Sequence, residues 1–169
     1  MPKVVAVLVE QDYQDLEVWY PILRFREAGL TVVSVGTGSQ ASYKGKCGYP
    51  ITPDTTVDRV KAADLAALIV PGGWAPDFLR RSQACVQLVR DCDAAKKAIG
   101  AICHGGWLLC SAGILKGRTM TSFFAIQDDC VNAGAKWVDQ EVVVDGNLVT
   151  SRKPDDLPAF CKAILTKII

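Results

Sequence analysis

Residues 98–109 read Ala98-Ile99-Gly100-Ala101-Ile102-Cys103-His104-Gly105-Gly106-Trp107-Leu108-Leu109. A short apolar run ends in Cys103, the only histidine and two glycines follow, and an apolar segment of helical character continues the chain. This order predicts a strand, a sharp turn and a helix, which is the arrangement of a nucleophile elbow. Small neighbours suit such a turn, because a nucleophile on a strained backbone must stand clear of bulky side chains.

The same stretch predicts a reactive thiol at Cys103. A helix that starts just after the turn directs its free N–H groups at the sulfur, and those dipoles favour the thiolate and can also hold an oxyanion. The alternative is a structural cysteine at the end of a strand, because free cysteine is among the most buried residue types.

Strand and helix patterns alternate along the rest of the chain. Apolar runs predict buried strands over residues 4–9, 31–35, 65–70 and 98–102. Helical spacing and end signals predict helices over 16–27, 82–94, 107–111, 123–132 and from Pro154 onward. Residues 36–50 read as a long loop or small hairpin, and residues 141–150 as a β-hairpin that turns at Asp145-Gly146.

This alternation predicts one α/β domain over residues 1–169, with a mainly parallel sheet covered on both sides. Sites in such sheets lie at the carboxyl ends of the strands, near a topological switch point. Three segments then converge on one edge: residues 10–17, residues 71–77 and the elbow at Cys103.

Composition excludes several classes of partner and cofactor. Nineteen basic and eighteen acidic side chains give a net charge of +1 with no basic block, so nucleic acid and anionic membranes are not expected partners. No apolar run approaches the roughly 20 residues of a membrane span, and residues 1–9 predict a strand rather than a signal peptide. Seven cysteines without a C-x-x-C pair, and one histidine, argue against a metal site and for reduced thiols in the cytoplasm. No nucleotide-binding motif follows the first strand, so no cofactor is expected.

An acidic loop, residues 10–17, bears on the acidity of Cys103. An ionised carboxylate beside the sulfur raises the thiol pKa, whereas a protonated carboxyl donates a hydrogen bond to the thiolate and lowers it. Burial beside Cys103 would keep Glu17 protonated, and the two groups would titrate as a unit. Alternatively these acids cap the first helix, which is the interpretation we prefer for Asp12 and Asp15. The sequence leaves both roles open for Glu17.

His104 is the only candidate imidazole base in the chain. Adjacent residues on an extended backbone point apart, so contact with Cys103 requires the bend of the elbow; the alternative is a histidine that only packs in the turn. A basic histidine needs an acid to orient it, and Asp77 is the nearest by architecture, although it can equally cap the next helix. The N–H groups of Gly72, Gly73 and His104 are candidates for an oxyanion hole, whereas Pro-Gly-Gly is also ordinary turn chemistry.

Six segments carry a resemblance to known proteins: residues 15–17, 71–73, 101–105, 111–118, 132–139 and 142–152. Together, and in order over nearly the whole chain, they resemble the PfpI proteins of the ThiJ/PfpI superfamily. The resemblance implies a flavodoxin-like three-layer sandwich of the class I glutamine amidotransferase-like group. It implies Cys103 as nucleophile, Glu17 as its protonated partner, and His104 near a subunit interface with Asp77 supplied by the neighbouring chain.

Relatives of this kind are named as intracellular proteases, as deglycases or glyoxalases, and as redox-responsive stress proteins or chaperones. The resemblance thus implies a homodimer or higher homo-oligomer whose Cys103 thiolate attacks an aldehyde or acyl carbon in stress protection. Small aldehydes, glycated adducts and peptides are the expected substrates. The alternatives are a non-catalytic redox sensor in which Cys103 oxidises reversibly, and a chaperone with exposed apolar patches.

Overall fold

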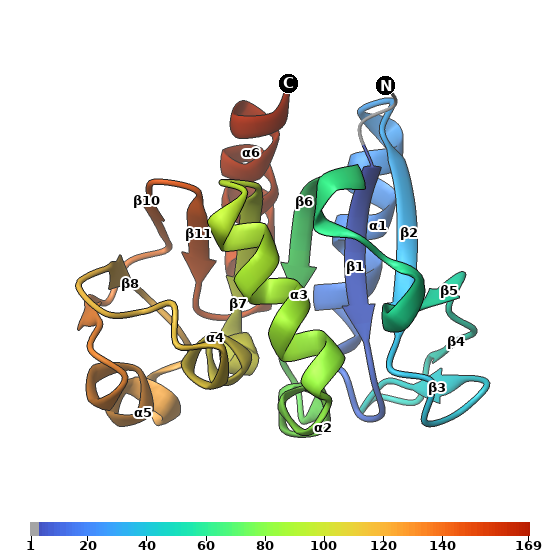
Figure 1. The fold of residues 1–169 in the computed structure, drawn as a ribbon, viewed down its shortest axis with the longest axis horizontal. Coiled ribbons are helices and arrows are strands. Elements are labelled where there is room, and N and C mark those ends of the chain that lie inside the picture. Colours follow the sequence, from blue (N-terminus) through green and yellow to red (C-terminus); the bar gives the residue numbers. More distant parts are fainter. Residues whose placement is uncertain (1–3) are drawn as a thin grey trace.

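A mainly parallel sheet organises the computed structural model, which describes residues 4–169 (Figure 1). Within these residues the central sheet has seven strands in the order β10-β11-β7-β6-β1-β2-β5. Their bounds are β1 (Val4–Val9), β2 (Thr31–Gly36), β5 (Thr55–Thr56), β6 (Leu65–Val70), β7 (Ala98–Ile102), β10 (Val142–Asp145) and β11 (Leu148–Ser151). Neighbouring strands run parallel except β10, which runs antiparallel to β11. The predicted fold class is therefore confirmed.

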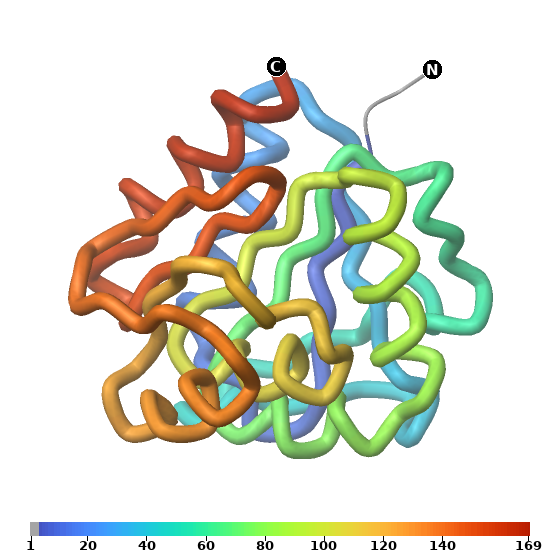
Figure 2. Tube along the Cα trace, turned by 60° about the vertical axis from the view of Figure 1, so that its left-hand side comes forward, coloured from blue at the N-terminus to red at the C-terminus, as the bar shows by residue number. Residues whose placement is uncertain are grey.

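Helices cover both faces of this sheet. They are α1 (Asp15–Glu27), α2 (Ala75–Arg81), α3 (Gln83–Ala94), α4 (Gly106–Ala112), α5 (Gln127–Asn132) and α6 (Leu157–Ile168). The paired helices α1 and α6 lie on one face and α3 lies on the other, which gives three layers (Figure 2). Glycine at position 100 admits α6, because a Cβ there would lie 2.5 Å from Ile164 Cδ1. The central strands are buried between the layers, as their continuous apolar runs predict.

The order of the strands places a topological switch point between β1 and β6. The chain leaves β1 for β2 on one side and later returns to β6 on the other. The carboxyl ends of β1, β6 and β7 reach one edge of the sheet, where α2 and α4 also lie (Figure 1). The three segments expected to converge do meet at this edge.

Local details differ from the sequence-based expectations. The hairpin turns at Gly146-Asn147 rather than Asp145-Gly146, because Asp145 pairs with Leu148; Gly146 takes a φ of 58° at the first turn position. The expected helix over 123–132 divides into a 3-10 turn, Phe124–Ile126, and α5. A 3-10 turn, Pro154–Asp156, likewise precedes α6.

The remaining strands form two small sheets. β3 (Tyr43–Lys44) and β4 (Pro50–Ile51) pair antiparallel, so residues 36–50 contain the small hairpin that was one of their two predicted forms. β8 (Thr119–Met120) and β9 (Lys136–Trp137) pair parallel. No helix within residues 4–169 has the length and apolar character needed to cross a bilayer.

Candidate active site

Cys103 stands on a strained turn directly after β7. Its φ is 59°, in the left-handed region that costs a residue with a Cβ about 1–2 kcal/mol. A 3-10 turn, Cys103–Gly105, then leads into α4. Glycine at position 105 lets this turn pass the end of β6, because a Cβ there would lie 2.6 Å from the Val70 carbonyl oxygen. The backbone therefore has the strand, turn and helix of a nucleophile elbow.

The elbow brings the thiol and the imidazole together. Cys103 Sγ lies 3.2 Å from His104 Nδ1. The imidazole stacks on the Phe123 ring at a centroid distance of 5.1 Å and meets the Trp107 ring edge-on at 5.2 Å. Burial lowers the pKa of His104, and the charge of Lys46 lowers it further. A neutral imidazole held in contact with a thiol is suited to accept and return protons.

Glu17 projects from α1 into the same space and is fully buried. Its Oε2 accepts a hydrogen bond of 2.7 Å from the Gly72 N–H, and its carboxyl also hydrogen-bonds with the Cys103 thiol. Among the described residues, Glu17 Oε1 has no hydrogen-bond partner. Burial raises the pKa of Glu17 to about 7, against the lowering effects of these hydrogen bonds and of Lys46. The carboxyl can therefore hold its proton near neutral pH.

Cys103 and Glu17 affect each other's ionisation. Burial and the charge of Glu17 together raise the pKa of Cys103 to about 12, against the lowering effect of the backbone N–H groups of Gly73 and His104. The N–H dipoles of the turn therefore do not by themselves overcome the effect of burial on the thiol pKa. The sequence likewise indicated that they supply only part of the help that Cys103 needs. The pair loses one proton near pH 7 and keeps the other until about pH 12. The carboxyl thus ionises at lower pH than the thiol, so a thiolate near neutral pH requires the Cys103 proton to pass to Glu17.

The two glycines after β6 have different roles. The Gly73 N–H points at the Cys103 sulfur, as does the His104 N–H, so both remain candidates for holding an oxyanion. The Gly72 N–H is already donated to Glu17, which corrects its expected place in the oxyanion hole. Gly72 is also needed for space, because a Cβ there would lie 2.6 Å from Glu17 Oε2 and 2.7 Å from Cys103 Cβ.

Asp77 does not reach His104 within this chain. It lies in the first turn of α2 and forms an ion pair with Arg81 one turn later. Within residues 4–169 the His104 ring contacts the Cys103 thiol and the rings of Trp107 and Phe123. A role for Asp77 at the imidazole therefore stays a prediction about a neighbouring subunit.

The acidic loop also differs from expectation, because Gln14 rather than an aspartate caps α1. Gln14 Oε1 accepts a hydrogen bond of 3.0 Å from the Glu17 N–H. The Asp15 carboxylate instead accepts hydrogen bonds from the N–H groups of Cys47 and Tyr49, at 2.9 and 3.1 Å. It thereby holds the loop between β3 and β4, which carries Lys46.

Backbone hydrogen bonds join the loops around the thiol. The Asp12 N–H donates to the Lys44 carbonyl, and the Asp12 carbonyl accepts from the Trp74 N–H, both at 2.8 Å. The Gln14 N–H donates to the Gly72 carbonyl at 3.2 Å. Residues 12–14 thus link the loop of β3 and β4 to the loop that follows β6.

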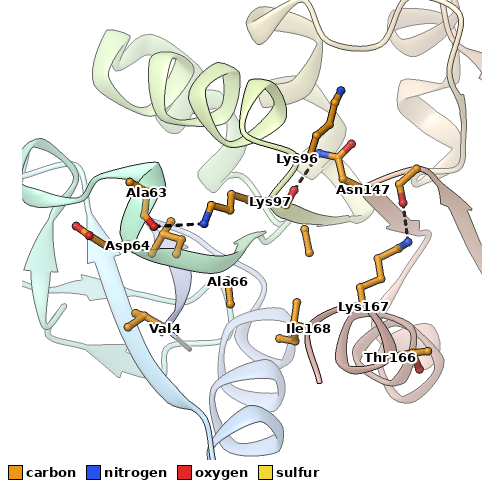
Figure 3. A pocket seen from close by; sticks show the side chains of 13 residues that line it. Val4, Ala63, Asp64, Ala66, Lys96, Lys97, Asn147, Thr166, Lys167 and Ile168 are labelled. Carbon is orange, nitrogen blue, oxygen red and sulfur yellow. Dashed lines mark hydrogen bonds between the residues drawn. The ribbon is translucent and has the colours of Figure 1, made fainter. Parts of the chain in front are cut away.

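A cavity of about 390 Å³ opens above Cys103 and His104. Its walls include four side chains that the sequence did not single out: Lys46, Trp74, Phe123 and Lys153. They come from four separate loops, and no motif marks them. A larger hollow of about 1120 Å³ lies at the opposite edge of the sheet, where Lys97 and Lys167 donate to backbone carbonyls (Figure 3). None of the candidate site residues lines it. Residues 4–169 hold no cluster of His, Cys, Asp and Glu suited to a metal ion.

Known proteins are similar in sequence to this chain over nearly its whole length. The DJ-1/PfpI family matches residues 3–167. The chain belongs to the DJ-1/PfpI family. It is 44% identical over 167 residues to the protein/nucleic acid deglycase 2 of Escherichia coli, which covers 98% of this chain and 97% of that protein. It is 40% identical over 158 residues to the deglycase PfpI of Pyrococcus furiosus, covering 94% and 95% of the two chains.

Solved structures of the family have the same fold. The DJ-1/ThiJ/PfpI-like and ferritin-like two-domain protein of Anabaena variabilis matches with a TM-score of 0.95 and 41% identity. The match covers 97% of this chain and 47% of that longer one. Drosophila melanogaster DJ-1beta matches with a TM-score of 0.90 and 28% identity, covering 99% and 91%. Relatives named as deglycases support an enzyme of this family.

Proposed function

We propose that this protein is a cysteine-nucleophile enzyme that attacks an aldehyde or acyl carbon, as a deglycase, a glyoxalase-type lyase or a peptidase. The observation that carries the proposal is the contact of one thiol with both an imidazole and a buried carboxyl. Cys103 Sγ lies 3.2 Å from His104 Nδ1 and hydrogen-bonds with Glu17, which is fully buried. A structural cysteine needs neither partner.

The first step forms a bond between sulfur and carbon. The Cys103 thiolate attacks the carbonyl carbon, and the carbonyl oxygen takes the negative charge. The N–H groups of Gly73 and His104, which face the sulfur in the free protein, stabilise that oxygen. With an aldehyde, a proton from Glu17 completes a hemithioacetal. This step uses the proton that burial keeps on the carboxyl.

His104 carries the next proton. With an acyl substrate the adduct expels its leaving group, which takes the proton of Glu17 relayed through the imidazole. A thioester remains on Cys103, and water hydrolyses it, which releases the acid and returns the proton to the thiol and carboxyl. With a 2-oxoaldehyde the imidazole removes the C–H proton of the hemithioacetal and returns it to the adjacent carbon, so that a thioester of a 2-hydroxy acid forms. Both routes release a carboxylic acid and regenerate the thiol.

A homo-oligomer would complete the site. The imidazole has no carboxylate partner among residues 4–169, and Asp77 lies half-buried on α2. A neighbouring subunit can supply Asp77 to orient His104. A role in stress protection in the cytoplasm agrees with the name of a relative, general stress protein 18 of Bacillus subtilis, which is 44% identical over 164 residues. Small aldehydes, their adducts with amines or thiols, and peptides are the proposed substrates.

The proposal is tested by parallel assays of the wild type and Cys103→Ser. Each protein is offered methylglyoxal, a thiol glycated by methylglyoxal, and a panel of peptides, and acid products are quantified by chromatography. We expect the wild type to turn over at least one substrate and Cys103→Ser to turn over none. Equal activity of the two proteins would refute the thiol mechanism. No turnover by the wild type, with reversible oxidation at Cys103, would favour the redox sensor.

A further inference from the structure

Two further cysteines meet outside the site described above. Cys110 lies on α4 and Cys130 on α5, which packs against α4, and each thiol affects the ionisation of the other. Cys110 Sγ lies 3.7 Å from the Asp129 carbonyl oxygen, and Cys130 Sγ lies 3.9 Å from Ser122 Oγ. Both sulfurs are free thiols. The carbonyl that Cys110 Sγ approaches belongs to the residue before Cys130, so both thiols lie at the contact between α4 and α5, where small side-chain movements can join them in a disulfide.

The two thiols have different surroundings. Cys110 is half-buried and therefore reachable, whereas Cys130 is buried. The Arg80 guanidinium lies nearby, positioned by a hydrogen bond of 2.9 Å from Nε to Ser111 Oγ. The neighbouring Cys130 thiol lowers the pKa of Cys110, with a further contribution from Arg80, whereas the Cys110 thiol raises the pKa of Cys130. One thiol is thus disposed to ionise while the other keeps its proton.

We propose that Cys110 and Cys130 form a second reactive site, a redox-active thiol pair that reduces hydroperoxides. Cys110 is the attacking thiol, because it is the more accessible of the two and lies close to Arg80. Cys130 is the resolving thiol, because it is buried at the contact between α4 and α5, beside Cys110. This site is separate from Cys103 and does not depend on the function proposed for that residue.

The reaction balances with hydrogen peroxide as oxidant. The Cys110 thiolate attacks one peroxide oxygen, an S–O bond forms, the O–O bond breaks, and the leaving hydroxide takes a proton to become water. Cys130 then attacks the sulfenic sulfur; an S–S bond forms, the S–O bond breaks, and the hydroxyl leaves as water with the Cys130 proton. Two thiols lose two electrons and one peroxide becomes two waters. A small-molecule dithiol restores the reduced pair.

The pair lies close to the elbow. Cys130 packs against the first residue of α4, since a Cβ added to Gly106 would lie 3.3 Å from Cys130 Sγ. Trp107, which touches the His104 ring, also donates a hydrogen bond of 2.8 Å to Asp129. A disulfide would therefore join α4 to α5 seven residues beyond Cys103.

The test uses the Cys103→Ser protein, so that trypsin fragment 98–116 contains one cysteine, Cys110. Cys130 lies alone in fragment 119–136. The protein is treated with one equivalent of hydrogen peroxide, alkylated, digested without reductant and examined by mass spectrometry. We expect fragments 98–116 and 119–136 to be linked, two thiols to be lost per chain, and dithiothreitol to reverse both. The same measurement is repeated on the wild type, where sequencing of the linked fragments by mass spectrometry distinguishes Cys110 from Cys103.

Two variants give this test its specificity. In Cys130→Ala the sulfenic acid at Cys110 has no resolving thiol, so dimedone should label Cys110 and no linked fragment should form. Cys161→Ala, which removes a buried thiol of α6, should form the link as the parent does. The proposal fails if peroxide links other cysteines, joins two chains, oxidises Cys47 first, or leaves Cys110 and Cys130 both unlinked. Each of these outcomes is independent of turnover at Cys103.

Discussion

Glu17 and Cys103 are two buried acids in hydrogen-bonding contact, and they hold one proton between them from about pH 7 to about pH 12. Neither residue can be understood alone. A buried thiol without a partner would stay protonated at neutral pH. A buried carboxyl without a partner would only lower the stability of the folded protein. Their contact makes a protonated carboxyl and a thiolate available together.

The reactivity of Cys103 should therefore rise through pH 7 rather than through the ordinary thiol range. Glu17→Gln keeps a hydrogen-bond donor but removes the titrating acid, so the thiol must lose its own proton against burial. We expect the midpoint of Cys103 alkylation by iodoacetamide to move up by at least one pH unit in Glu17→Gln. Mass spectrometry of fragment 98–116 across pH gives the midpoint. The same midpoint in both proteins would show that Glu17 only packs.

Glu17 should also make the fold less stable at alkaline pH. Its pKa is raised from 4.5 to about 7, so burying Glu17 costs the fold free energy only where the unfolded chain is ionised. That cost is absent below pH 4.5, grows as the unfolded chain ionises, and is complete above pH 7. That shift corresponds to a destabilisation on the order of 3 kcal/mol. We expect Glu17→Gln to raise the free energy of unfolding by up to about this amount at pH 8 and by little at pH 4.

The control for that measurement is Glu27→Gln, on the exposed face of the same helix. Urea unfolding at pH 4 and pH 8 should show no comparable change in this variant. If Glu17→Gln increased the free energy of unfolding equally at both pH values, the raised pKa of Glu17 would not be the cause of the increase.

Gly72 should be irreplaceable for activity. The methyl group of Gly72→Ala would lie 2.6 Å from Glu17 Oε2 and 2.7 Å from Cys103 Cβ, so one of the two must move. A displacement of about 1 Å at a reacting group can lower kcat/KM about 100-fold. Gly113→Ala is the control for lost stability, because Gly113 ends α4 with open space around it but with a φ of 71°, which costs an alanine about 1–2 kcal/mol without touching the site. Turnover should survive in Gly113→Ala, and full turnover in Gly72→Ala would refute the packing argument.

Lys46 should tune the imidazole through its charge. Because Lys46 lowers the pKa of His104, Lys46→Met should raise it, and Lys44→Met on the neighbouring strand should have a smaller effect. His104 is the only histidine, so one proton resonance in an NMR titration reports its pKa. The difference between wild type and Lys46→Met should shrink at high salt, since Lys46 is exposed. A salt-independent difference would point to a change of structure.

Asp77 should act across a subunit interface if it acts on His104. Mixing inactive Cys103→Ser with inactive Asp77→Ala should restore part of the activity, because a mixed interface can pair an intact Cys103 with an intact Asp77. Dilution of the wild type should lower its specific activity as subunits separate. Full activity in a demonstrated monomer, or no recovery after proven subunit exchange, would leave Asp77 as the ion-pair partner of Arg81.

The sequence predicted the parts of the molecule that depend on local patterns. Strands β1, β6 and β7 are continuous apolar runs, and the turn at Cys103 is marked by the glycines that follow it. Features that depend on long-range contacts had no such mark. Asp15 accepts hydrogen bonds from the N–H groups of Cys47 and Tyr49, and any residue could have donated them. Gly72 donates to Glu17 because the switch point places β1 beside β6.

The hydrogen bonds that join residues 12–14 to the neighbouring loops are made by backbone atoms. Such bonds survive when the side chains at those positions change. Residues on the walls of the cavity, such as Trp74 and Lys46, can therefore be exchanged while the thiol, the imidazole and the carboxyl keep their places. Substrate preference is then free to diverge during evolution without loss of the chemistry. A mutant library restricted to these wall positions should yield folded proteins with altered selectivity.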